Sequence, residues 1–161
     1  MIVLRTSDAL SRALAGQRER NVSIGFVPTM GTLHAGHRAL VEASRRTCGF
    51  TVVSIYVNPL QFESSAAFRR YPRFMKKDLD LLHRWNVDAA FCPTDESFPG
   101  HRRLRVIETD VSRRYEGAVR PGHFDGVLTI VAKLFLHVRP ARAFFGEKDF
   151  QQLWLVRRMA E

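Results

Sequence analysis

The sequence predicts an α/β protein with a doubly wound, mostly parallel sheet. Short apolar runs rich in β-branched residues alternate with segments whose apolar residues recur at helical spacing. Strand–helix–strand units have right-handed crossovers, so the strands should run parallel with helices on both faces. At 161 residues, 45% of them hydrophobic, the chain has the size of one domain.

The first half of the chain should hold two strands and two helices. Thr6 can cap the first helix because its hydroxyl can accept a hydrogen bond from a first-turn amide. Pro28 and the residues after it should end the first strand. In chain order we expect a helix after Thr6, a strand at residues 22–27, a helix from about residue 36 and a buried strand at residues 51–57.

The second half should continue the alternation after a polar connection at residues 58–72. One helix is predicted by apolar residues at positions i, i+3, i+4 and i+7, namely Val127, Ile130, Val131 and Leu134. The other expected elements are a helix at about residues 75–82, strands at 89–92 and 104–108, a loop at 115–125, a buried strand at 141–145 and a last helix at 148–159.

Charge and composition narrow the class of partner. The formal net charge of +9 attracts anions, but the basic pairs are scattered, which favours small phosphates over nucleic acid. No apolar run reaches the ~18 residues of a membrane span, so we expect a soluble, cytoplasmic protein without a membrane partner. The two cysteines, Cys48 and Cys92, lie far apart and are expected to be buried, reduced thiols.

Three loops should open onto one edge of the sheet, because each follows a predicted strand and ligands bind beyond the carboxyl ends of parallel strands. They span residues 28–37, 58–62 and 146–152. The first contains His34 and His37 around Gly36, where a close backbone approach and helix-start amides suit phosphate oxygens. A satisfied pair of ordinary histidines is the alternative; a zinc site lacks a third ligand at metal-like spacing.

The other two loops carry polar side chains of complementary kinds. Asn58 and Gln61 can both donate and accept, as recognition of a hydroxyl or carboxylate requires, although a plain turn is an open alternative. Lys148 can offset phosphate charge and Asp149 can hold ribose or Mg²⁺, unless the loop is only a capping cluster. A P-loop is excluded, because His123 and Phe124 follow residues 117–122 where Lys and Ser/Thr are needed.

These loops belong to a longer series of motifs. In order they are Pro-Thr-Met-Gly from Pro28 with His-Ala-Gly-His from His34, Val-Asn-Pro-Leu-Gln-Phe from Val57, Tyr-Pro-Arg from Tyr71, Glu-Gly-Ala-Val-Arg-Pro-Gly-His-Phe from Glu116, and Phe-Gly-Glu-Lys-Asp-Phe-Gln-Gln from Phe145. Their order and spacing resemble those of pantothenate synthetases, of the His-x-Gly-His nucleotidyltransferase superfamily, over nearly the whole chain. The resemblance implies a Rossmann-like, nucleotide-binding domain at residues 1–161.

The resemblance also implies roles for individual residues. His37, His34 and Lys148 would act on the ATP phosphates. Gln61 and Gln152 would bind pantoate, with Gln61 also bordering the β-alanine site and Asn58 supporting the same pocket. Asp149 would hold Mg²⁺, and Arg120 and His123 lie in a motif typical of the family. The ATP-binding residues by similarity are Met30, Gly31, Thr32, Leu33, His34, Ala35, Gly36, His37, Gly146, Glu147, Lys148 and Asp149.

The implied reaction is the ATP-dependent condensation of (R)-pantoate with β-alanine through a pantoyl-adenylate, in a homodimer with Mg²⁺. The family continues beyond Glu161 into a carboxyl-terminal lid, so this domain would lack the lid. Glu63 departs from the family pattern and should mildly repel an anionic substrate. Another adenylyltransferase of the superfamily and a nucleotide-binding module without turnover are the alternatives.

Overall fold

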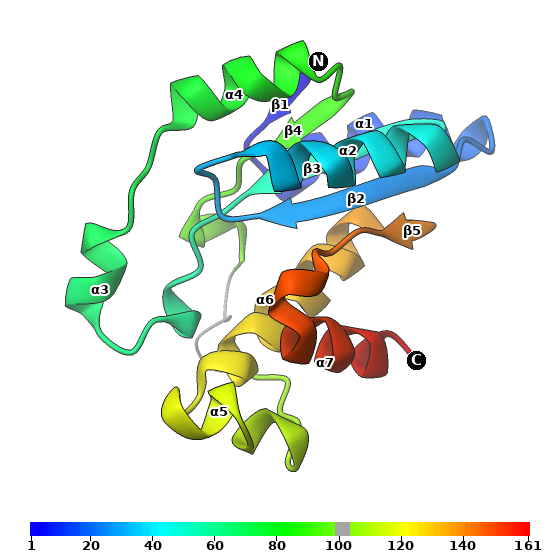
Figure 1. The fold of residues 1–161 in the computed structure, drawn as a ribbon. Coiled ribbons are helices and arrows are strands. Elements are labelled where there is room, and N and C mark those ends of the chain that lie inside the picture. The colour runs from blue at the N-terminus through cyan, green and yellow to red at the C-terminus, as the bar shows by residue number, and fades with distance from the viewer. Residues whose placement is uncertain (99–103) are drawn as a thin grey trace.

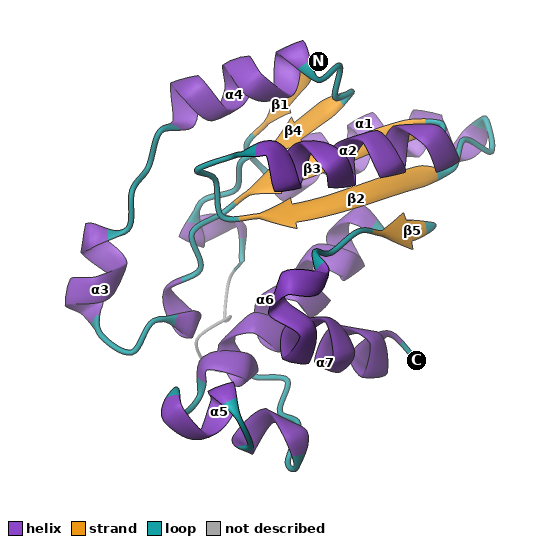
Figure 2. Cartoon of the chain, viewed as in Figure 1, coloured by secondary structure: helices purple, strands orange, loops and turns teal. Residues whose placement is uncertain are grey.

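The computed structural model describes residues 1–98 and 104–161. Within these residues, five strands form one parallel sheet in the order β1-β4-β3-β2-β5 (Figures 1 and 2). The strands are β1 (Ile2–Leu4), β2 (Ile24–Thr29), β3 (Phe50–Ile55), β4 (Ala89–Phe91) and β5 (Arg142–Ala143). The predicted α/β class with a parallel sheet is confirmed.

The helices cover both faces of this sheet (Figure 1). They are α1 (Ser7–Glu19), α2 (Ala35–Thr47), α3 (Ser65–Arg70), α4 (Met75–Arg84), α5 (Glu116–Val119), α6 (His123–Val138) and α7 (Phe150–Ala160). As expected, Thr6 caps α1: its Oγ1 accepts a hydrogen bond from Ala9 N at 3.2 Å.

Two apolar cores explain why the central strands read as continuous hydrophobic runs. Successive side chains of β2 point to opposite faces. Phe26 packs in the core that α1, α6 and α7 close, whereas Val27 packs in the core that α2 and α4 close. Both side chains are fully buried. The sheet is therefore covered on both faces, as a doubly wound fold requires.

Pro28 lies inside β2, so the strand does not end before it as expected. The carbonyls of Ile24 and Phe26 accept hydrogen bonds from the β5 segment, at 2.8 Å from Ala141 N and 2.9 Å from Phe144 N. Alternate residues of a strand face the same neighbour, so Pro28 faces β5 next, and it has no N–H to donate. The β2–β5 ladder stops there, and β5 is a two-residue strand at the sheet edge instead of the buried strand predicted for residues 141–145.

Residues 104–108 do not form the predicted strand. The amide of Val106 donates to Thr129 Oγ1 on α6 at 2.9 Å, so it is not available to a ladder. Leu104 and Ile107 are 74% and 56% exposed, although their apolar character suggested a strand. Val106 therefore joins this segment to α6, and the segment has no strand partner among the described residues.

Other boundaries differ from the predicted ones. The short strand β1 was not predicted, because three half-exposed residues carry little pattern. The connection at residues 58–72 contains α3, and the loop at residues 115–125 contains α5 and the first turn of α6. Both cysteines are free thiols; Cys92 is buried as expected, whereas Cys48 is partly exposed.

Candidate active site

A cavity of about 550 Å³ opens at the carboxyl ends of β2, β3 and β5. All three loops that were expected to meet at this edge contribute to its wall, so their predicted convergence is confirmed. The predicted site residues that line it are Met30, Gly31, Thr32, His34, Gly36, His37, Asn58, Gln61, Gly146, Lys148, Asp149 and Gln152.

The loop after β2 has an unusual backbone that a buried carboxylate holds. Gly31 and Thr32 have φ angles of 82° and 56°, in the left-handed region that only glycine adopts without strain. Asp78 on α4 accepts hydrogen bonds from Thr32 N at 2.9 Å and Leu33 N at 2.8 Å. A Cβ atom on Gly31 would lie 2.8 Å from Asp78 Oδ2, so this position has no room for a side chain.

His34 and His37 form a capping box at the start of α2. His34 Nδ1 accepts a hydrogen bond from Gly36 N at 3.1 Å, and His37 Nδ1 accepts one from His34 N at 3.3 Å. Since each Nδ1 is an acceptor, each neutral ring carries its proton on Nε2. The ring centroids lie 4.1 Å apart. Two N–H donors and the amide end of a helix therefore gather at one side of the cavity.

His37 is neutral at physiological pH in this arrangement. Burial lowers its pKa to about 4, the neighbouring His34 adds to the decrease, and Asp78 opposes it. A neutral imidazole can donate one hydrogen bond to an anion without the cost of keeping a buried charge when the site is empty.

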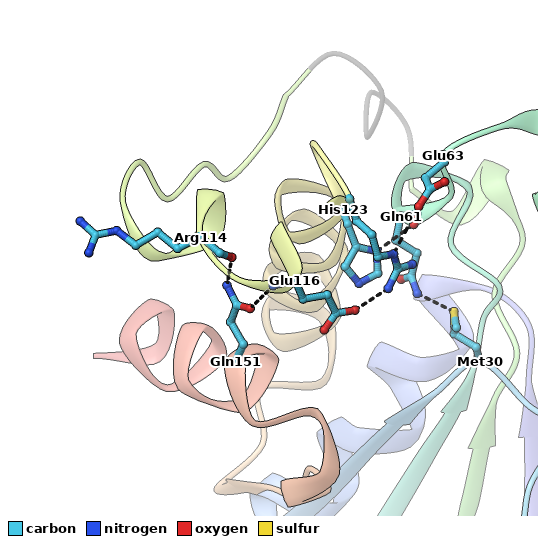
Figure 3. Close-up of polar contacts among 8 residues, drawn as sticks. Met30, Gln61, Glu63, Arg114, Glu116, His123 and Gln151 are labelled. Atoms are coloured by element: carbon cyan, nitrogen blue, oxygen red, sulfur yellow. Dashed lines mark hydrogen bonds and ion pairs between the residues drawn. The ribbon is translucent and has the colours of Figure 1, made fainter. Parts of the chain in front are cut away.

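The loop after β3 presents Gln61 to the cavity, and Figure 3 shows its contacts with Met30 and His123. Its Nε2 lies 2.8 Å from Met30 Sδ, and its Oε1 accepts a hydrogen bond from Asn58 Nδ2 at 3.1 Å. Asn58 is 1% exposed and also bonds Leu60 N and the carbonyl of Gly126. Asn58 is thus mainly a support for Gln61, which keeps one N–H for a ligand.

Helix α6 fixes the same loop from the other side. His123 Nδ1 lies 2.8 Å from the carbonyl oxygen of Gln61, and burial lowers the pKa of this imidazole. A Cβ atom on Gly126 would lie 2.3 Å from Leu60 O, so the helix and the loop are in backbone contact. His123 does not line the cavity; it holds the residue that does.

Arg120 forms ion pairs beside the cavity and does not line it. Its guanidinium lies 2.6 Å from Glu116 and 3.6 Å from Glu63. Glu63 is therefore partly neutralised by a cation and lies outside the cavity wall. This ion pair offsets part of the repulsion of an anionic substrate that is expected from Glu63.

Two adjacent glutamines after β5 have different surroundings. Gln152 lines the cavity together with Lys148 and Asp149. Gln151 instead donates to the carbonyls of Val111 and Arg114, both at 2.8 Å, and accepts from Glu116 N (Figure 3). Lys148 is exposed and has no ion-pair partner among the described residues.

One wall of the cavity is apolar and is formed by residues that the sequence predicts only as the buried face of a helix. The residues at i, i+3, i+4 and i+7 of α6, Val127, Ile130, Val131 and Leu134, belong to the core and also line the cavity. An apolar wall beside convergent polar groups is typical of small-molecule sites.

Several residues fall outside the expected pattern. Of the predicted ATP-binding residues, Leu33 is buried in the core, whereas Ala35 and Glu147 do not line the cavity. Tyr56 and Tyr71 line the cavity although they were not predicted as site residues, and Asp78 holds the loop without lining the cavity. Tyr71 begins the Tyr-Pro-Arg motif, which could have indicated a role in the site. Asp78 lies in a helix rich in charged residues, where no sequence pattern distinguishes it.

The chemistry of the donor set limits what metal the site can hold. No group of three or more His, Cys, Asp or Glu side chains in residues 1–98 and 104–161 is arranged to bind a metal ion by itself. Asp149 is a single carboxylate in the cavity wall. One carboxylate suits a Mg²⁺ ion that is held mainly by phosphates and water.

The parallel sheet and the cavity at its carboxyl edge define a Rossmann-like α/β domain of the ligand-binding type. The chain belongs to the pantoate-beta-alanine ligase family, whose model matches residues 2–161. It is 55% identical over 138 residues to the pantothenate synthetase of Thermus thermophilus, covering 84% of this chain, and 48% identical over its whole length to that of Hydrogenovibrio crunogenus.

Solved structures agree with this assignment. The pantothenate synthetase of Thermus thermophilus superposes with a TM-score of 0.91 at 49% identity over 99% of this chain. A pantoate-beta-alanine ligase from Francisella tularensis, determined in complex with Beta-gamma ATP and β-alanine, superposes with a TM-score of 0.94 at 34% identity, also over 99%. The chain spans 50% and 58% of the two sequence relatives and 57% and 62% of these two structures.

Proposed function

We propose that this chain supplies the catalytic cavity of a pantothenate synthetase, which condenses (R)-pantoate with β-alanine at the expense of ATP. The carboxylate of pantoate attacks the α-phosphorus of ATP, the bond to pyrophosphate breaks, and a pantoyl-adenylate forms. The amine of β-alanine then attacks the acyl carbon and AMP leaves. No protein nucleophile is needed, because the substrate carboxylate is itself the nucleophile.

The observation that carries this proposal is the shared cavity of His37, Lys148 and Gln61. Two imidazoles that accept at Nδ1 and carry a proton on Nε2, the start of α2 and the ammonium group of Lys148 suit a triphosphate. Gln61 and Gln152 suit the hydroxyl and carboxylate groups of a small organic acid. The Francisella relative in complex with Beta-gamma ATP and β-alanine supports the same pair of ligand classes.

The residues then have separate tasks. His34, His37 and Lys148 bind the phosphates and offset the charge that develops on departing pyrophosphate. Gln61 and Gln152 hold pantoate in line with the α-phosphorus, and the apolar wall of α6 accommodates its methyl groups. Asn58 and His123 fix the position of Gln61.

Mg²⁺ is part of the proposal as an ion that enters with ATP. When bound, it would neutralise phosphate charge. Asp149 would hold it from the protein side, which fits the single carboxylate in this wall. The chain itself would contribute the carboxylate of Asp149, which lies next to Lys148 in the cavity wall.

A pyrophosphate-release assay with this chain tests the proposal. With ATP, Mg²⁺ and pantoate we expect release of pyrophosphate without β-alanine, and free AMP together with pantothenate when β-alanine is added. Pyrophosphate release that β-alanine or pantoate does not influence favours another adenylyltransferase. ATP binding without any release favours a nucleotide-binding module.

The assembly and location belong to the proposal as well. We propose a homodimer in the cytoplasm, on the resemblance to the family. In the described part of the chain, no helix has the length and apolar character needed to span a bilayer. Analytical ultracentrifugation tests the dimer: one species of twice the 18.5 kDa chain mass is expected, and a monomer contradicts it.

A further inference from the structure

We propose that Asp78 is a positioning residue for the loop that binds the nucleotide, acting through the backbone of Thr32 and Leu33. This role rests on the proposed function and assigns a task to a residue that no motif of the sequence singled out. Asp78 lies on α4, 45 residues from Leu33 along the chain. Its position beside the loop is created only by the fold.

Both oxygens of the Asp78 carboxylate accept hydrogen bonds from the loop. Its Oδ2 accepts from Thr32 N at 2.9 Å and its Oδ1 accepts from Leu33 N at 2.8 Å. Asp78 is 2% exposed and is absent from the wall of the main cavity. Hydrogen bonds to a charged acceptor are about twice as strong as neutral ones. Asp78 therefore anchors the loop and does not itself contact a ligand in the cavity.

The loop needs such an anchor because its conformation is strained. Thr32 has a φ of 56°, which a β-branched residue rarely adopts. The second residue after Thr32 is His34, which caps α2 and faces the cavity. Loss of the anchor lets Thr32 relax toward a negative φ and rotates His34 and the start of α2 away from the bound phosphates.

The sign of the effect separates positioning from simple electrostatics. A carboxylate near phosphates repels them, so removal of its charge alone should strengthen ATP binding. If Asp78 acts by holding the loop, its removal should weaken ATP binding. Asp78→Asn keeps the shape of the side chain but places an NH₂ group against one of the two amides, so the bidentate anchor is lost.

The test uses the 161-residue chain with ATP and Mg²⁺ in isothermal titration calorimetry, together with amide NMR spectra. In Asp78→Asn we expect ATP affinity to fall about tenfold or more, the effect of losing one charge-assisted hydrogen bond. The amide protons of Thr32 and Leu33 should also move upfield. Asp80→Asn, the same change at an exposed position of α4, should alter neither quantity.

Gly31→Ala is a second variant that disturbs the contact without changing the carboxylate, because its Cβ would lie 2.8 Å from Asp78 Oδ2. It should weaken ATP binding to a similar extent. Unchanged or stronger binding of ATP by Asp78→Asn overturns the positioning role. A wild-type chain that does not bind ATP contradicts the proposed function itself, and this role with it.

Discussion

Gln61 Nε2 lies 2.8 Å from Met30 Sδ, which joins the loop after β3 to the loop after β2 (Figure 3). Met30 precedes the strained turn at Gly31, and Gln61 Oε1 accepts a hydrogen bond from Asn58 Nδ2. The residues proposed to bind the triphosphate and those proposed to bind the acid are thus coupled by direct contact. A thioether is a weak acceptor, so a ligand with a stronger acceptor can displace it.

Replacing His37 or Lys148 by Ala should slow pyrophosphate release by about 100-fold or more, the usual effect of losing one charge-stabilising donor. His83→Ala and Lys77→Ala are matched controls, because both side chains are exposed on α4 and do not line the cavity. Steady-state rates at saturating ATP measure the effect. Wild-type rates in both the His37 and the Lys148 variant would contradict their proposed role in binding the phosphates.

The low pKa of His37 predicts a pH dependence of stability. Its folded-state pKa of about 4 lies below the ordinary value of 6.5. Between these values the unfolded chain binds a proton that the folded chain does not, so stability is lost as pH falls through this window. Urea unfolding from pH 4.5 to 7 should show a smaller decrease for His37→Gln. An identical pH profile for the two proteins contradicts the assignment.

ATP should raise the pKa of His37, because phosphate charge favours the imidazolium form. NMR titration of the His37 ring should give a midpoint of about 4 without ATP and a higher midpoint with ATP. ATP binding should therefore take up protons at pH 5. A midpoint that ATP does not change would place the triphosphate away from this ring.

Gln151 and Gln152 are neighbours with different expected phenotypes. Gln152→Ala should raise the KM for pantoate about tenfold or more, the loss of one ligand hydrogen bond, with little change in stability. Gln151→Ala leaves the carbonyls of Val111 and Arg114 without their donor. Because water can replace part of this donor at the exposed Arg114 carbonyl, the change should lower the unfolding free energy by about 0.5–1.5 kcal/mol. Reversed phenotypes would mean that the two side chains have the opposite roles.

Gly126→Ala should distort the site from outside it. The added Cβ would lie 2.3 Å from Leu60 O, so α6 and the Gln61 loop must separate. We expect a loss of about 1–3 kcal/mol in stability and a raised KM for pantoate. Gly16→Ala on α1 is the control; with nothing within 4 Å of its Cβ, it should stabilise the chain by up to ~1 kcal/mol. Equal effects of both changes would argue against the close contact.

The sequence predicted those parts of the fold that repeat a strong local pattern. The buried runs around Phe26 and Val52 and the apolar face of α6 were recognised because burial on both faces and helical spacing leave clear signals. Residues 104–108 looked like a strand because apolar residues can also pack as extended chain. The amide of Val106 goes to Thr129, and no local pattern encodes such a tertiary bond.

For the candidate site, the sequence predicted the loop residues that line the cavity, but it did not predict the residues that hold those loops in position. His34, His37, Gln61 and Lys148 follow strands, so the rule for parallel sheets brought them together. Asp78 acts on a backbone from a distant helix, and its surroundings in the sequence are those of an ordinary charged face. Residues that position others are specified by the fold and are visible only when the structure is known.

A crystal structure of this chain with a non-hydrolysable ATP analogue, Mg²⁺ and pantoate tests the central claim most directly. The account predicts the triphosphate against His37 and Lys148, with the pantoate carboxylate beside the α-phosphorus and its hydroxyl groups within hydrogen-bond distance of Gln61 or Gln152. Nucleotide and acid bound in separate cavities, or a triphosphate that contacts neither His37 nor Lys148, would contradict it.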